Sequence, residues 1–176
     1  PENVFTIARR LVTGAYNLPP VRITFPEGET VRDAAERVHT AYPEIITGDF
    51  IAKAEQYEGY LFPDTYLFLP SADTDTIIKA MRENFNEKTA SLTSEISTSG
   101  HSLAEIVTTA SLIEKEARTS SVRRMVSGIL WNRIKLGMPL QVDAVFGYIY
   151  GRDTYSPTFD DLRVDSPYNT YLHKGL

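Results

Sequence analysis

The chain has 176 residues, 42% of them hydrophobic, which suits one compact domain or one domain with a small appendage. It has no cysteine, which excludes disulfides and thiolate-held metals, and its formal net charge of −5, without a concentrated basic patch, argues against a nucleic-acid partner. No apolar run approaches the roughly 20 residues needed to span a bilayer, so we expect any membrane anchor to precede Pro1.

The start of the chain contains two similar short units that predict helices. Apolar residues recur at helical spacing in residues 1–12. The same spacing returns in residues 26–38, where Thr30 and Asp33 form a candidate N-cap pair. The sequence VRITF between the two units, residues 21–25, predicts a strand.

Three segments follow in the middle of the chain. Residues 58–69, EGYLFPDTYLFL, are dense in aromatic side chains and predict an extended segment that turns at Pro63. Residues 75–92 predict a helix from the spacing of their apolar side chains. Residues 89–100 are rich in serine and threonine and predict a loop or a frayed helix end.

Two helices are well marked in the second half. Ser102 and Glu105 form a capping box at the start of the first helix. Its apolar stripe is predicted to contain Leu103, Ile106, Val107, Ala110 and Ala117. The second helix is predicted from about residue 121 to 136, with Gly137 as its end. The last forty residues, rich in tyrosine, glycine, proline and aspartate, predict short strands and loops.

The stretch TTASLIEKEART places two carboxylates two residues apart. Because a helix turns about 100° per residue, Glu114 points onto the apolar stripe and Glu116 points away from it, so the two are not a catalytic pair. A buried carboxylate needs a partner, and Arg133 falls within the apolar stripe predicted for the next helix, so we predict a Glu114–Arg133 ion pair. Glu116 is either a solvated surface residue or a general acid at the mouth of a cleft.

Four motifs follow one another along the chain, EGYLFPDTY (58–66), ASLIEKEA (110–117), NRIKLGMPLQVD (132–143) and SPYNTY (166–171). In this order they resemble the YceG-like family, the MltG-type endolytic murein (peptidoglycan) transglycosylases. The resemblance implies an α+β fold with two parts. Residues 1–42 would form a LysM-like strand–helix portion, incomplete at its N-terminus. Residues 43–176 would form a mainly helical YceG-like catalytic domain with short strands, truncated at its C-terminus.

The resemblance also implies an activity and a site. Enzymes of this family are lyases that cleave the bond between N-acetylmuramic acid (MurNAc) and N-acetylglucosamine (GlcNAc), leaving a 1,6-anhydromuramoyl end. Their catalytic glutamate is the second Glu of an E-K-E motif, here Glu116, and one acid/base suffices because the muramoyl 6-hydroxyl replaces water as nucleophile. The motifs supply these substrate-binding candidates, each with a purely structural role left open: Tyr60, Phe62, Asp64, Tyr66, Gln141, Asp143, Asn169 and Tyr171. No metal or cofactor is implied.

The expected partner is the peptidoglycan glycan strand, with cell-wall synthesis enzymes such as penicillin-binding proteins as further candidates. We expect the protein at the extracytoplasmic face of the bacterial cytoplasmic membrane, held only through a missing N-terminal anchor. Two alternatives remain open at this point. One is a non-catalytic peptidoglycan-binding module or scaffold of cell-wall synthesis. The other is an ordinary muramidase, which needs a second carboxylate, Asp64 or Asp143, across a cleft from Glu116.

Overall fold

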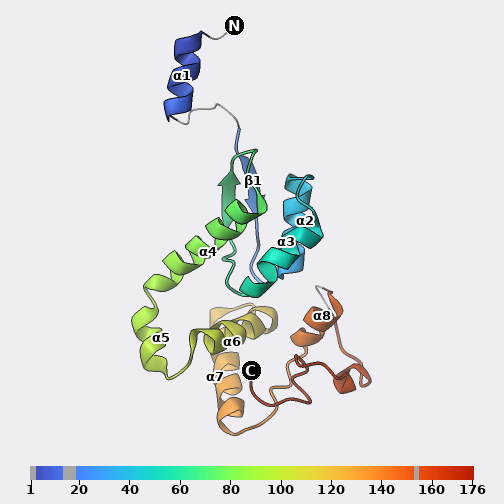
Figure 1. The fold of residues 1–176 in the computed structure, drawn as a ribbon. Helices are drawn as coiled ribbons and strands as arrows, with labels where there is room; N and C mark the ends of the chain where they lie inside the picture. The colour runs from blue at the N-terminus through green and yellow to red at the C-terminus, as the bar shows by residue number, and fades with distance from the viewer. Residues whose placement is uncertain (1–2, 14–18, 153–154) are drawn as a thin grey trace.

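The computed structural model describes residues 3–13, 19–152 and 155–176. Over these ranges the fold is α+β, as predicted, and it is mostly helical with one small sheet (Figure 1). The elements in chain order are α1 (Val4–Thr13), β1 (Val21–Thr24), α2 (Val31–Ala41), α3 (Thr47–Ala54), the 3₁₀ helix η1 (Glu55–Tyr57), β2 (Thr65–Phe68), α4 (Thr74–Ala90), α5 (Thr93–Ser99), α6 (Leu103–Glu116), α7 (Ser120–Lys135), α8 (Ala144–Tyr150) and the 3₁₀ helix η2 (Asp161–Arg163).

The sheet consists of β1 and β2, which pair antiparallel with Val21 opposite Phe68 and Thr24 opposite Thr65. The side chains alternate across the sheet, so that Ile23 is buried while Thr24 is exposed. The outward-facing hydroxyls of Thr24 and Thr65 lie 2.8 Å apart and link the two strands. The predicted strand at residues 21–25 and the turn at Pro63 are therefore confirmed.

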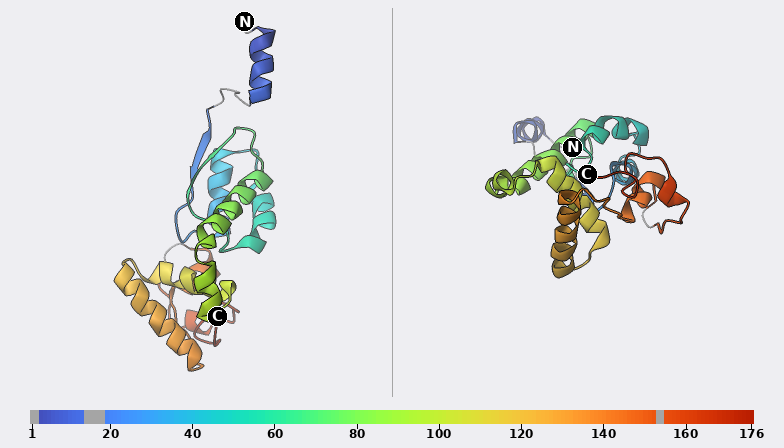
Figure 2. Two further views of the ribbon diagram at one scale, coloured as in Figure 1. Left: turned by 90° about the vertical axis from the view of Figure 1, so that its left-hand side faces the viewer. Right: turned by 90° about the horizontal axis from the view of Figure 1, so that it is seen from below.

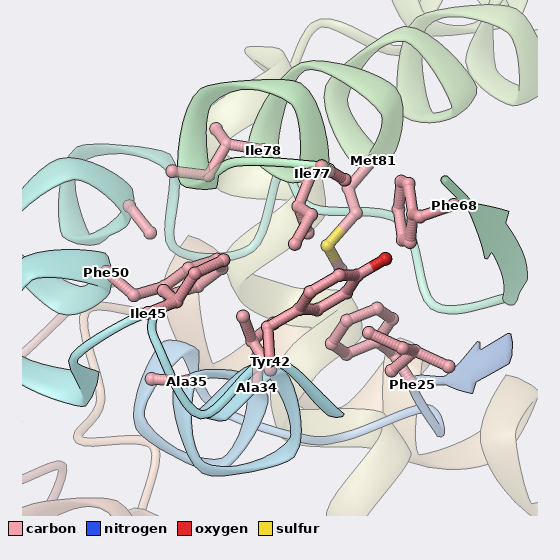
Figure 3. Close-up of a cluster of buried hydrophobic side chains, with 14 of the residues drawn as sticks. Phe25, Ala34, Ala35, Tyr42, Ile45, Phe50, Phe68, Ile77, Ile78 and Met81 are labelled. Atoms are coloured by element: carbon pink, nitrogen blue, oxygen red, sulfur yellow. The ribbon is translucent and has the colours of Figure 1, made fainter. Parts of the chain in front are cut away.

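A first cluster of buried side chains lies between this sheet and helices α2, α3 and α4 (Figure 3). It runs from Ile23 to Met81, and Phe50 at its centre is fully buried. The Tyr42 ring belongs to the cluster, and its hydroxyl donates to the carbonyl of Leu69 at 2.8 Å. The cluster takes residues from both sides of position 42, and the predicted division of the chain at that position stays a prediction.

A second cluster lies between α7, α8 and the segment that joins them. Its buried members are Leu130, Leu140, Val142, Val145 and Phe146. Partly buried side chains of α6, among them Leu112 and Ile113, pack against it. The two views of Figure 2 show α6, α7 and the C-terminal segment grouped at one end of the molecule, while α1 lies at the other end, away from the rest.

Glycine turns of the first part touch α6 and the region after α8. A Cβ atom at Gly59 would lie 2.9 Å from a methyl carbon of Val107, and one at Gly28 would lie 3.3 Å from Cε of Lys115. A Cβ atom at Gly151 would lie 3.5 Å from a guanidinium nitrogen of Arg32. These close approaches set the relative position of the two buried clusters.

Two expectations about secondary structure were wrong. The Ser/Thr-rich stretch contains a helix, α5, rather than a loop, and the C-terminal forty residues contain α8 where short strands were expected. In α8, Val145, Phe146 and Gly147 are buried, so tertiary packing stabilises a helix of only seven residues.

The predicted faces of the two long helices were also partly wrong. On α6 Thr109 is buried while Ala110 is exposed. On α7 the predicted stripe residues Val122, Met125 and Ile129 are 41%, 67% and 49% exposed, and Leu130 is buried instead. The buried face is therefore rotated from the predicted stripe by about one residue, or roughly 100°.

Candidate active site

Glu116 is the last residue of α6, and its side chain is exposed. One carboxylate oxygen accepts a hydrogen bond of 3.3 Å from the backbone N–H of Ala144, the first residue of α8. Helix α6 thus delivers its terminal carboxylate to the start of a helix 28 residues further along the chain. An N–H donor at this distance stabilises the ionised form of the carboxylate.

Asp143 and Tyr171 form a hydrogen-bonded pair beside Glu116. The hydroxyl of Tyr171 donates to Asp143 at 2.5 Å. This bond, burial and the negative charges of Asp143 and Glu116 raise the pKa of the Tyr171 hydroxyl to about 12. Since both charges act on the same hydroxyl, Glu116, Asp143 and Tyr171 belong to one electrostatic site.

The segment before Asp143 is held by two residues that are distant in the sequence. Arg133 donates to the Leu140 carbonyl at 2.7 Å and to the side-chain oxygen of Gln141 at 3.1 Å. Thr170 bonds the backbone on the other side, since its carbonyl accepts from the Gln141 N–H at 3.0 Å. Gln141 has a φ of 54°, a left-handed conformation that non-glycine residues rarely adopt, and among the described residues only glycines share it.

A pocket of about 370 Å³ opens next to this pair. Its lining consists of Asp143, Pro157, Thr158, Phe159, Leu162 and Tyr171. Phe159 is 84% exposed, so its ring is available for contact with a ligand. Aromatic faces bind the C–H groups of sugar rings, and carboxylate and phenol groups bind their hydroxyls.

Comparison with known proteins identifies this arrangement, because the YceG-like family matches residues 2–176. The chain belongs to the YceG-like family. The family predicted from the four sequence motifs is thereby confirmed.

Two curated relatives carry the same name, endolytic murein transglycosylase. The one from Bacillus subtilis is 38% identical over 138 residues, which cover 77% of this chain and 38% of that protein. The one from Streptococcus pneumoniae serotype 2 is 34% identical over 124 residues, covering 68% of this chain and 22% of that protein. The chain therefore spans well under half the length of either relative.

A crystal structure of a YceG-like protein from Listeria monocytogenes has a similar fold. It superposes with a TM-score of 0.81 at 29% sequence identity and covers 99% of this chain and 66% of that one. The arrangement of helices described above is thus a feature that this YceG-like chain shares with the Listeria protein.

The predicted ion pair between Glu114 and Arg133 was wrong. Glu114 pairs instead with Arg123, at 2.7 Å, near the start of α7. The same guanidinium donates to the Ala117 carbonyl at 3.0 Å, just after α6. Only three residues separate α6 from α7, so the first turn of α7 lies beside the last turn of α6, and Arg133 at the far end of α7 contacts residues 139–141 instead.

The Asn169 side chain of this YceG-like chain is fully buried. Its amide nitrogen donates to the carbonyls of Leu162 and Val164, at 3.2 and 2.8 Å, and its oxygen accepts from the Tyr171 backbone N–H at 3.0 Å. The amide therefore fixes the backbone that carries Tyr171. It acts on the site through Tyr171 rather than by an exposed group of its own.

The aromatic motif at residues 58–66 lies in the first part of the molecule. The Tyr60 ring meets Phe85 of α4 at 5.2 Å between centroids, and Lys88 of α4 lies 6.0 Å from the Phe62 ring. The Tyr66 ring stacks on Phe68 at 5.7 Å. These contacts place the three rings on α4 and the sheet.

Asp64 of the same motif also contacts α4. It accepts hydrogen bonds from the Thr65 N–H at 2.7 Å and from the amide of Asn84 at 3.1 Å, and both lower the pKa of Asp64. Asp143 lies beside Glu116, whereas Asp64 is bound to its own turn and to α4. Of the two carboxylates considered as partners of Glu116, the structure thus brings Asp143 to it.

Sequence reasoning missed Glu58, the first residue of the aromatic motif. Its carboxylate accepts from the backbone N–H of Val31, at 3.1 and 3.2 Å, and burial raises its pKa. Burial, followed by the charge of Glu58, raises the pKa of Tyr148 on α8 to about 12. Glu58 therefore lies where the first part meets α8, and its place at the head of a family motif was the available signal.

Two searches of the described residues found nothing. Within residues 3–13, 19–152 and 155–176, no group of three or more His, Cys, Asp or Glu residues is placed to hold a metal ion. In the same part of the chain, no helix has the length and apolar character of a membrane span.

Proposed function

We propose that the protein is an endolytic peptidoglycan lytic transglycosylase in which Glu116 is the general acid/base. One observation carries the proposal: an exposed glutamate at the family's motif position lies against the Ala144 N–H, beside the Asp143–Tyr171 pair. The names of the relatives from Bacillus subtilis and Streptococcus pneumoniae support the same reaction.

In the proposed reaction Glu116 first protonates the glycosidic oxygen between MurNAc and GlcNAc, and the bond from that oxygen to the MurNAc C1 breaks. The Glu116 carboxylate then takes the proton of the muramoyl 6-hydroxyl, whose oxygen forms a new bond to C1. The products are a free GlcNAc hydroxyl end and a 1,6-anhydromuramoyl end, and the catalyst regains its proton. The Ala144 N–H stabilises Glu116 in the carboxylate form that the second step requires.

The other motif residues receive roles around this step. Asp143 and Tyr171 bind sugar groups in the pocket that they line, and Gln141 binds beside them. Tyr60, Phe62, Asp64 and Tyr66 extend the glycan-binding surface along the first part, and Asn169 positions Tyr171. No cofactor is needed for any of these roles.

Asp143 also supports a second candidate function, that of an ordinary muramidase. It is a carboxylate close enough to Glu116 for both charges to act on Tyr171. In a muramidase it would activate water or attack C1 itself, and the product would have a reducing end. We prefer the transglycosylase because Tyr171 already occupies one oxygen of Asp143.

The wider setting follows from the substrate. We propose action outside the cytoplasmic membrane, on glycan strands, with cell-wall synthesis enzymes such as penicillin-binding proteins as partners. The LysM-like portion at residues 1–42 would hold the strand and the YceG-like region at residues 43–176 would cut it.

The test separates catalysis from binding. The parent protein, Glu116→Gln and the matched surface variant Glu87→Gln on α4 are incubated with purified peptidoglycan, and both sedimented protein and released glycan are measured. We expect all three proteins to sediment with the wall, and only Glu116→Gln to release no glycan. Equal release by Glu116→Gln and the parent would reject Glu116 as the acid. Sedimentation without release by any of them would favour the binding module.

A further inference from the structure

Gln141 is exposed, and its side-chain amide has a defined orientation. The amide oxygen accepts from a guanidinium nitrogen of Arg133 at 3.1 Å. Because an arginine can only donate, this bond fixes the oxygen toward Arg133 and directs the NH₂ group away from it. Gln141 therefore offers donors, not an acceptor, to a ligand at this site.

Arg133 also fixes the backbone that carries this amide. The same nitrogen lies 2.7 Å from the Leu140 carbonyl and 3.3 Å from that of Pro139, so one charged group binds three acceptors on consecutive residues. Bonds of this kind offset the strain of the left-handed conformation at Gln141, which costs about 1–3 kcal/mol. Strain held in this way at an exposed residue indicates a positioned functional group.

Asp143, two residues further on, presents the complementary group. Val142 between them is buried and is held from both sides of its peptide by the Thr170 hydroxyl, at 2.9 and 3.1 Å. Gln141 and Asp143 are both exposed, as alternate residues of an extended segment are. One oxygen of Asp143 accepts from Tyr171, which leaves the other as an acceptor next to the amide donors of Gln141.

An NH₂ donor beside a carboxylate acceptor matches the two polar groups of an acetamido substituent. The carbonyl of an acetamido group accepts one hydrogen bond and its N–H donates another. Hydroxyl groups would not require an amide fixed in one orientation, because a hydroxyl can rotate to donate or accept.

We propose that Gln141 and Asp143 together read a 2-acetamido group of the glycan, and that Arg133 is the positioning residue that orients Gln141 for it. This inference rests on the proposed function, because it assigns the acetamido sugar to the same site. Arg133 does not touch the sugar in this account, and its effect passes through Gln141.

The experiment measures binding, so that it does not depend on turnover. Short peptide-free glycan strands and the same strands after N-deacetylation are titrated calorimetrically into the full-length protein, with Glu116→Gln in every sample to prevent cleavage. Gln141→Met removes the amide donors without adding charge, and Gln56→Met on η1 is the matched control. We expect Gln141→Met to weaken binding of acetylated strands about tenfold, the loss for one hydrogen bond of roughly 1.4 kcal/mol, and to change binding of deacetylated strands less than twofold.

Arg133→Lys and the double variant test the positioning role. If Arg133 acts through Gln141, Arg133→Lys weakens binding of acetylated strands only, and the double variant is no weaker than Gln141→Met alone. Equal losses on both kinds of strand, no loss on either, or additive losses in the double variant would each overturn the inference. If the protein with Gln141 and Arg133 intact binds neither strand while remaining folded, the proposed function itself fails.

Discussion

At the scale of single residues, the site is assembled by groups that reach it from distant parts of the chain. Glu116 is contacted by a backbone N–H 28 residues away, and Tyr171 donates to Asp143 across the same separation. Arg123 and Arg133 each bind the backbone of a segment that carries a site residue. The positions of the reactive groups therefore depend on backbone contacts as much as on the groups themselves.

Glu58 provides a pH-dependent test at this scale. Burial and the nearby charge of Asp33 raise its pKa above the ordinary value of 4.5, despite the Val31 N–H and Arg32, which lower it. The folded state thus binds the Glu58 proton more tightly than the unfolded state does. This stabilisation is complete below pH 4.5 and is lost as the pH rises through the raised pKa.

Glu58→Gln keeps the residue neutral at every pH and should avoid that loss. We therefore expect the melting temperature of Glu58→Gln, relative to the parent, to rise between pH 4 and pH 7. Thermal unfolding followed by circular dichroism checks this, with the exposed Glu36→Gln on α2 as control. A difference that stays constant over the range would show that Glu58 does not titrate as described.

Residue-level prediction from the sequence succeeded where helix geometry alone decides. The rotation of 100° per residue placed Glu116 on the outside of its helix, and Glu116 is exposed. The partner of Glu114 could not be found in this way, because it depends on the three-residue turn between α6 and α7, which brings Arg123 rather than Arg133 beside it. The left-handed backbone of Gln141 likewise has no local signal, since Arg133 and Thr170 impose it.

At the scale of elements, the predicted helices formed where caps and periodicity agree. Thr30 with Asp33 and Ser102 with Glu105 form complete capping boxes, and both helices begin where these pairs predict. Helix α8 has no side-chain cap and was missed, because burial against the second cluster stabilises it. The aromatic motif at residues 58–66 was predicted as extended, and its turn at Gly59 proves to be a contact with α6.

The turn at Gly59 yields a prediction for this scale. Gly59 has a φ of +81°, and an added Cβ would lie 2.9 Å from a Val107 methyl carbon on α6. Gly59→Ala should therefore destabilise the protein, by about 1–3 kcal/mol. Gly48→Ala on α3 is the contrasting control, since its Cβ would have no neighbour within 4 Å; alanine there should stabilise by roughly 0.5–1 kcal/mol.

Urea unfolding of the two glycine variants measures both effects. If Gly59→Ala were as stable as the parent, the turn would not pack against α6 as closely as described. Loss of glycan release by Gly59→Ala, with its fold intact, would further show that this contact positions the first part relative to Glu116.

At the scale of the whole molecule, the chain contains two buried clusters joined by a limited set of contacts. The first is formed by the sheet with α2, α3 and α4, and the second by α7, α8 and the segment between them. The proposed acid lies at the end of α6, which touches the first part through Gly28 and Gly59 and packs on the second through Leu112 and Ile113. The site thus depends on both clusters.

Large-to-small substitutions in the two clusters test this organisation. Phe50 and Phe146 are both fully buried, one in each cluster. Replacing either by alanine should cost about 3–5 kcal/mol. In hydrogen exchange we expect Phe50→Ala to lose protection mainly in residues 21–85 and Phe146→Ala mainly in residues 112–171. Uniform loss of protection in both variants would instead indicate one cooperative unit.

The most direct test of the account is mass spectrometry of the glycan ends that the full-length protein produces from purified peptidoglycan. The account predicts 1,6-anhydromuramoyl ends from the parent and none from Glu116→Gln. Reducing ends from the parent would contradict it and would point to a muramidase in which Asp143 is the second carboxylate. Anhydromuramoyl ends from Glu116→Gln in the same amount as from the parent would contradict the assignment of Glu116 as the acid/base.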